Sequence, residues 1–145
     1  MEIVYNLLEQ PDIRIDNDAF SNCTKLKKIV LPSSIQTIGN NFFIRCTSLI
    51  DITIPSSVTK IDEHSFQNCS SLRKLSIPSS VTYIGKYAFK DCQSLLEIEL
   101  PSSLNSIEEG TFDNCSSLNQ INLPSTVTYI GASAFNSCIS MKLIT

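Results

Sequence analysis

The fold is decided by residues 69–91, CSSLRKLSIPSSVTYIGKYAFKD, because the chain repeats this 23-residue unit without an insertion. Three residue types keep the same period of 23 residues: Cys23, Cys46, Cys69, Cys92, Cys115 and Cys138; Phe20, Phe43, Phe66, Phe89, Phe112 and Phe135; Pro32, Pro55, Pro78, Pro101 and Pro124. Several residue types sharing one period indicate a solenoid in which identical units stack.

The repeat divides the 145 residues into units of one domain, 1–145. Residues 1–22 form an imperfect leading unit whose proline, Pro11, does not follow the period. Five full units occupy 23–137, and a truncated unit follows at 138–145. No unit buries enough apolar surface alone, so we expect each unit to be stabilised by its neighbours.

The first half of each unit predicts a short strand. In the unit quoted above, Leu75 and Ile77 alternate with Lys74 and Ser76, which is typical of a strand with one buried face. Pro78 has no N–H group to donate, so the strand is expected to end there.

The second half predicts one or two helical turns. Phe89, Cys92 and Leu95 lie three residues apart, a spacing that places side chains on one face of a helix. The residue before this phenylalanine is small in most units, but Phe42 breaks the rule and predicts a local displacement. The fold class is therefore an α/β repeat solenoid: a right-handed coil with a parallel sheet on one face and short helical turns on the other.

The cysteines are expected to be reduced and buried. All six occupy the same place in their units, so their side chains point the same way into the interior rather than toward each other. Disulfides and a metal site stay open as alternatives. Metal is disfavoured, because the chain has no C-x-x-C pair and its one histidine is His64, which we expect to be exposed on a helical turn.

Several function classes lack support in the sequence. A net charge of −3 and a pI near 5.0 do not favour nucleic acid as a partner. No apolar run is long enough to span a membrane, and the N-terminal residues 1–16 lack the pattern of a secretory signal peptide. No catalytic or cofactor-binding motif is found, so neither an enzyme nor a cofactor is expected.

Asn22, Asn68 and Asn114 begin glycosylation sequons, but we interpret them as polar residues that end the helical turns.

One family shares this pattern closely. Residues 77–85, IPSSVTYIG, followed by Ala88, Phe89 and Cys92, resemble the unit of the BspA-like (Treponema pallidum type) leucine-rich repeat family. The position of the ladder asparagine of common leucine-rich repeats is held by a hydroxyl residue, as at Ser80. The resemblance implies a surface antigen or adhesin, located at the cell surface or outside the cell, that binds host proteins such as fibronectin and fibrinogen.

The leading hypothesis is thus a non-enzymatic protein-interaction module. Two alternatives are a structural module that self-associates through uncapped solenoid ends and an intracellular leucine-rich repeat scaffold. The outward positions of the strands change from unit to unit, as expected of a partner-binding surface. The candidate contacts are Lys28, Val30, Asp51, Thr53, Lys74, Ser76, Glu97, Glu99, Gln120 and Asn122.

Overall fold

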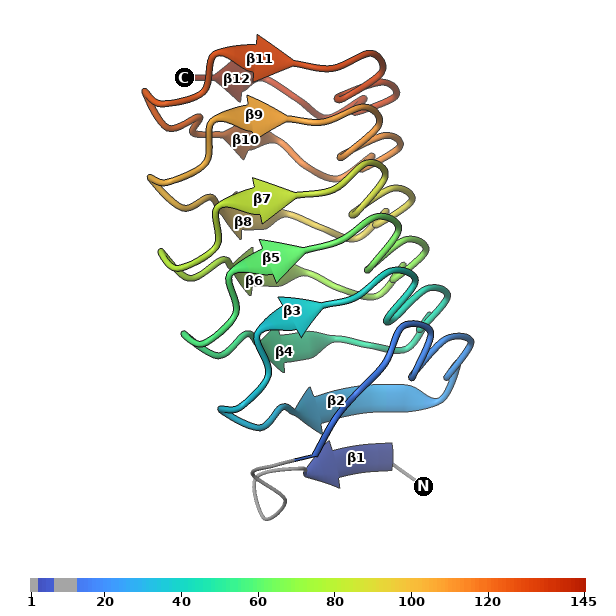
Figure 1. Ribbon diagram of the computed structural model, residues 1–145. Coiled ribbons are helices and arrows are strands. Elements are labelled where there is room, and N and C mark those ends of the chain that lie inside the picture. Colours follow the sequence, from blue (N-terminus) through green and yellow to red (C-terminus); the bar gives the residue numbers. More distant parts are fainter. Residues whose placement is uncertain (1–2, 7–12) are drawn as a thin grey trace.

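The computed structural model describes residues 3–6 and 13–145, which form a stack of coils of 23 residues with parallel strands on two sides (Figure 1). The first side carries β1 (Ile3–Asn6), β2 (Leu26–Val30), β4 (Asp51–Thr53), β6 (Lys74–Ser76), β8 (Glu97–Glu99), β10 (Gln120–Ile121) and β12 (Leu143–Ile144). The second side carries β3 (Thr37–Ile38), β5 (Lys60–Ile61), β7 (Tyr83–Ile84), β9 (Ser106–Ile107) and β11 (Tyr129–Ile130). The parallel sheet and the repeat unit were therefore predicted correctly.

The strands pair in a register of one unit. Lys28 lies opposite Asp51, and Lys74 lies opposite Glu97. Side chains at equivalent positions therefore stack in rows along the solenoid. Each inward row is buried along most of its length, because a coil covers the apolar face of its neighbour; residues of the last coils, such as Ile130, are exposed.

The predicted helical turns were wrong. The described residues contain no helix, and the segment between the second strand and the next unit is a series of tight turns. Ala88 and Cys92 donate their N–H groups to carbonyls three residues earlier, whereas Tyr87 and Phe89 donate to the following coil, at Glu109 and Thr111. A helix keeps all of these bonds within one segment, so the bonds to the next coil exclude it. We call this region the turn side.

Two residues in each coil adopt a left-handed backbone that also interrupts a helix. In one coil they are Tyr87, with φ of 57°, and Asp91, with φ of 60°. The sequon asparagines Asn22, Asn68 and Asn114 hold the second of these positions, so they sit in turns and do not end a helix. Asparagine tolerates this conformation better than most residues, which accounts for its frequency there.

Stacked phenylalanines form the centre of the core. The ring centroids of Phe66 and Phe89 are 5.3 Å apart, and those of Phe89 and Phe112 are 5.6 Å apart. Phe42 is also fully buried and packs edge-on against Phe43. Like Ala88, Phe42 donates its N–H to the carbonyl three residues earlier and accepts an N–H from the preceding coil. The predicted displacement is therefore not seen in the hydrogen-bond pattern.

All six cysteines are unbridged as predicted, and Cys46, Cys69, Cys92 and Cys115 form a second buried row. The Cys69 thiol donates to the carbonyl of Phe43 over 3.3 Å, and the Cys92 thiol to that of Phe66 over 3.2 Å. Burial, reinforced by the neighbouring Cys23, raises the pKa of Cys46 to about 12. These thiols therefore remain protonated and act as small, hydrogen-bonded core residues.

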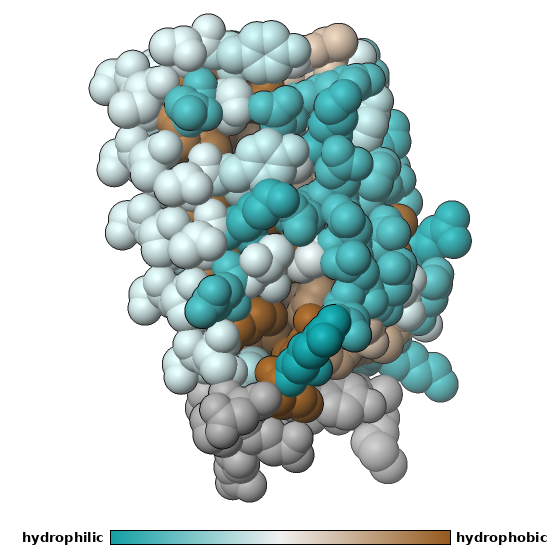
Figure 2. All heavy atoms as spheres, in the orientation of Figure 1, coloured by the Kyte–Doolittle hydropathy of each residue, from teal (hydrophilic) through white to brown (hydrophobic). Residues whose placement is uncertain are grey.

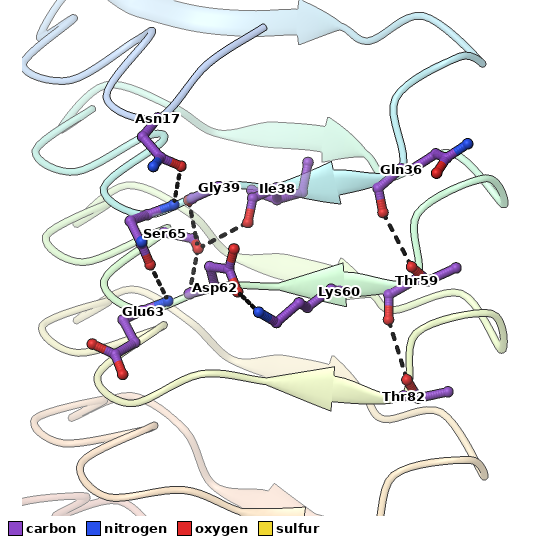
Figure 3. Close-up of polar contacts among 11 residues, drawn as sticks. Asn17, Gln36, Ile38, Gly39, Thr59, Lys60, Asp62, Glu63, Ser65 and Thr82 are labelled. Carbon is purple, nitrogen blue, oxygen red and sulfur yellow. Dashed lines mark hydrogen bonds and ion pairs between the residues drawn. The ribbon is translucent and has the colours of Figure 1, made fainter.

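Hydroxyl and amide groups tie neighbouring coils together at the surface. At the ladder position, Ser80 donates to the carbonyl of Val58 over 2.6 Å. The second side of the solenoid shows two similar rows: Thr82 donates to the carbonyl of Thr59 (Figure 3), and the Asn17 side chain accepts the N–H of Asn40. Serine thus replaces a ladder asparagine by bonding directly to the previous coil.

Close approach of the coils explains why glycine recurs in every other coil directly after the strands of the second side. A Cβ atom added at Gly85 would lie 2.7 Å from the carbonyl carbon of Asp62, and one at Gly131 would lie 2.5 Å from the backbone nitrogen of Glu109. Both distances are shorter than real contacts, so these positions exclude side chains. Glycine and acidic residues alternate along this row, as Gly39, Asp62, Gly85, Glu108 and Gly131.

Candidate functional site

The predicted contact residues form one surface, which we call the strand face: the outward side chains of β2, β4, β6, β8 and β10, with Asn122. Nine of these ten side chains are exposed and Val30 is half-buried. The alternating residues Ile29, Ile52, Leu75 and Ile98 point inward and are buried. The rigid core therefore holds a row of varied, accessible side chains at fixed spacing.

Opposite charges face one another along this row. The Lys74 Nζ lies 2.8 Å from the Glu97 Oε2, and the Lys28 Nζ lies 3.5 Å from the Asp51 Oδ2. The Lys74 and Glu97 side chains are 67% and 57% exposed. Ion pairs this exposed contribute about 0–1 kcal/mol, so a partner can rearrange them at little cost.

A hollow of ≈ 400 Å³ opens over the middle of the strand face. It joins six of the predicted residues from three strands, while Lys28, Val30, Gln120 and Asn122 lie outside it. In the described part of the chain, β4 and β6 belong to separate sheets and are not paired beneath the hollow. The predicted residues that line it are Asp51, Thr53, Lys74, Ser76, Glu97 and Glu99.

The turn side carries a polar network that sequence reasoning missed. The Lys86 Nζ lies 3.1 Å from the Glu109 Oε2, and Tyr87 donates its hydroxyl to the same carboxylate. These hydrogen bonds, first from Tyr87 and then from Lys86, hold the pKa of Glu109 below its ordinary value. The hydrophilic side chains of this region gather at the right of Figure 2. Opposite charges 23 residues apart in the sequence were the available signal.

A second part of this network is more buried. Lys90 pairs with Asp113, and Asn136 donates to the other Asp113 oxygen over 2.8 Å. Burial raises the pKa of Asp113, but the bonds from Lys90 and Asn136 outweigh it, so the pKa is lowered. These side chains already bind one another, so the network contributes to the stacking of coils.

His64 belongs to the turn side as well. It is half-buried in a left-handed turn, with φ of 58°, so the prediction of an exposed residue on a helical turn was wrong. Its ring stacks on Tyr87 with 5.2 Å between centroids, and its Nδ1 lies 2.6 Å from the Gln67 Oε1. These contacts give the imidazole a structural role between two coils.

The described residues show neither a metal-binding cluster nor a membrane span. No group of three or more His, Cys, Asp or Glu side chains within residues 3–6 and 13–145 is placed to hold a metal ion. No helix that could cross a membrane is present in the same part of the chain.

The family follows from the repeat and its geometry together. A model of the BspA-type leucine-rich repeat region matches residues 13–145 in six copies. The chain belongs to this family. Proteins of the leucine-rich repeat class generally serve as protein-interaction modules, which agrees with the accessible strand face described above. A search of curated protein sequences finds no match to the chain.

Solved structures of similar proteins share the fold. A leucine-rich repeat protein of Bacteroides ovatus is 34% identical with a TM-score of 0.86, over 89% of this chain and 33% of its own. A leucine-rich cell surface protein of Faecalibacterium prausnitzii is 32% identical with a TM-score of 0.81, over 98% and 42%. The T. pallidum leucine-rich repeat protein is 28% identical with a TM-score of 0.75, over 97% and 78%. The chain thus spans less than half the length of the first two proteins.

Proposed function

We propose that the chain is a non-enzymatic protein-binding module and that its strand face contacts the partner. The observation that carries the proposal is the hollow, which lies where outward side chains differ between coils while inward ones are kept apolar. Varied polar groups on a rigid support are suited to recognising a particular partner surface.

The charged pairs favour the strand face over the turn side. Lys90 and Asp113 are only 31% and 11% exposed and bind each other, so a partner would have to disrupt an interaction between coils. The Lys74–Glu97 pair is far more exposed. A partner that contacts the strand face therefore disrupts fewer of the interactions that hold the coils together than a partner that contacts the turn side.

We further propose display at the cell surface and binding to host extracellular proteins. Support comes from the family and from the similar Faecalibacterium prausnitzii protein, which is described as a cell surface protein. Fibronectin and fibrinogen are the probes to use first.

Reversing one ion pair tests the binding face. The double variant Lys74→Glu with Glu97→Lys keeps the pair but inverts its charges, and the matched control is Lys86→Glu with Glu109→Lys on the turn side. We expect the first to weaken surface-plasmon-resonance binding of immobilised fibronectin or fibrinogen, mainly through a slower association rate. Its free energy of unfolding should change by no more than about 0.5 kcal/mol.

The control variant gives the opposite result if the proposal is wrong. Normal binding by the strand-face variant, with loss of binding by the turn-side variant, would assign recognition to the turn side. Failure of the wild-type chain to bind either probe would remove the support for these host proteins as partners.

A second candidate is self-association at the end of the solenoid. The last coil exposes apolar side chains, with Ile139 at 84% and Leu143 at 50%. An exposed sheet edge with apolar neighbours favours pairing with another chain. Light scattering over a range of concentrations tests this, because a constant mass of 16.1 kDa would exclude association of the chain with itself.

A further inference from the structure

We infer that the hollow of the strand face accepts a cationic side chain, arginine or lysine, from an extended segment of the partner. This inference rests on the proposed function, since it specifies the chemistry of the surface that the proposal assigns to binding. It commits to a basic partner segment, and an acidic or neutral segment is an outcome that would overturn it.

The charges of the hollow favour a cation. Three carboxylates line it, those of Asp51, Glu97 and Glu99, against the single ammonium of Lys74. Glu97 is paired with Lys74 at 2.8 Å and Asp51 with Lys28 at 3.5 Å, which leaves the charge of Glu99 uncompensated by any ion pair among the described residues. An anionic ligand would meet net repulsion, whereas a cation would meet complementary potential.

Glu99 is the group best placed to receive the cation. Its Oε2 accepts a hydrogen bond from the Ser76 hydroxyl over 2.8 Å. It forms no ion pair with any described residue, unlike Asp51 and Glu97. Ser76 thus orients the carboxylate without neutralising it, and a guanidinium or ammonium would supply the missing charge.

The walls of the hollow suit the stem of such a side chain. Half-buried Pro78 lines it together with the charged residues, and the buried Ile54 and Leu75 lie at its base. Lysine and arginine place their methylene groups along apolar surface while the charged head stays in water. The apolar lining beside Glu99 therefore fits a long cationic side chain better than a short polar one.

Two synthetic peptides test the inference directly. The probes are Gly-Ser-Gly-Arg-Gly-Ser-Gly and the same peptide with glutamate in place of arginine, both with blocked termini, added to the isotope-labelled chain. We expect the arginine peptide to shift the amide resonances of Thr53, Ser76 and Glu99 in two-dimensional NMR spectra in a saturable way. The glutamate peptide should leave them unchanged.

A matched pair of variants locates the carboxylate. Glu99→Gln should weaken binding of the arginine peptide by about two- to fivefold, the range for one exposed charge pair. Glu63→Gln is the control, because Glu63 is an exposed carboxylate beside the second sheet that also lacks an ion pair in the described residues. It should bind the peptide like the wild type.

The outcomes separate this inference from the proposed function. Equal shifts with both peptides, or unchanged affinity in Glu99→Gln, would overturn the preference for a cation at Glu99. If the Lys74–Glu97 reversal still weakened binding of a host protein, the strand face would remain the binding surface. Peptide-induced shifts confined to the turn side, together with a partner insensitive to that reversal, would overturn both.

Discussion

The same pentapeptide, Val-Thr-Tyr-Ile-Gly, occurs at residues 81–85 in the middle of the solenoid and at 127–131 near its end. Ile84 in the first copy is 2% exposed, whereas Ile130 in the second is 50% exposed. Both isoleucines occupy two-residue strands, β7 and β11. Identical sequence therefore yields a core residue in one place and a surface residue in the other, and the difference is the presence of a following coil.

The phenylalanine and cysteine rows show the same contrast. Phe89 is fully buried between two stacked rings, whereas Phe135 stacks on Phe112 alone among the described residues and is half-buried. Cys92 is buried and Cys138 half-buried. Burial in this fold is thus a property of neighbouring pairs of coils, as nearest-neighbour energetics requires.

Replacing the central phenylalanine should have the largest effect. Phe89→Ala is expected to lower the free energy of unfolding by about 3–5 kcal/mol, because it removes a ring packed on both sides. Phe135→Ala should cost no more than about half of that, since its ring lacks one neighbour. Urea denaturation followed by circular dichroism measures both, and equal losses would contradict the dependence on a following coil.

Alkaline pH should reveal the buried thiols next. Burial raises the pKa of Cys46 from 9.0 to about 12, so the folded chain keeps a proton that the unfolded chain releases. The resulting stability is complete below pH 9 and is lost as the pH rises toward 12. Each such thiol contributes a slope of about −1.4 kcal/mol per pH unit within that window.

Single cysteine variants isolate this slope. In Cys46→Ala, the free energy of unfolding should fall less steeply with rising pH than in the wild type. The difference in slope should be that of one buried thiol, about 1.4 kcal/mol per pH unit. Cys138→Ala should change this slope less. Burial is the main cause of the raised pKa of Cys138, and this thiol is only half-buried. Identical slopes in the wild type and in Cys46→Ala would show that the buried thiol does not titrate in this window.

The smallest effect is expected from exchanging sulfur for oxygen. Cys69→Ser should cost about 1–2 kcal/mol, since the Phe43 carbonyl offers the new hydroxyl an acceptor but the apolar contacts of sulfur are lost.

In native labelling with a thiol reagent, Cys23 and Cys138 should react before the four buried cysteines. Uniform labelling rates would mean that the ends and the middle open together.

The periodic positions were predictable, because one interval governs them all. The alternation of Lys74 and Ser76 with Leu75 and Ile77 correctly indicated which side chains are exposed. The shared phase of the cysteines likewise indicated unbridged thiols. Stacking makes these predictions possible, since equivalent positions have equivalent surroundings wherever a unit has a neighbour on both sides.

The turn side was not predictable from spacing alone. Phenylalanine and cysteine three residues apart fit a helical turn, but they also fit successive tight turns with bonds to the next coil. Asn and Asp at the left-handed positions were a signal for turns, but Tyr87, His64 and Arg45 hold the same positions and obscured it. The hollow escaped prediction for another reason, because it depends on how three neighbouring strands lie relative to one another.

The alternation of glycine with acidic residues beside the second sheet bears on how such a chain can grow by gene duplication. Copying the coil that begins at Asp62 by itself would set two side chains in adjacent coils, at a position where a Cβ on Gly85 already meets the neighbouring backbone at 2.7 Å. Copying that coil together with the one that begins at Gly85 restores the alternation at both new junctions. We therefore expect an added coil in this protein to carry glycine at this position or to be copied together with a neighbour that does.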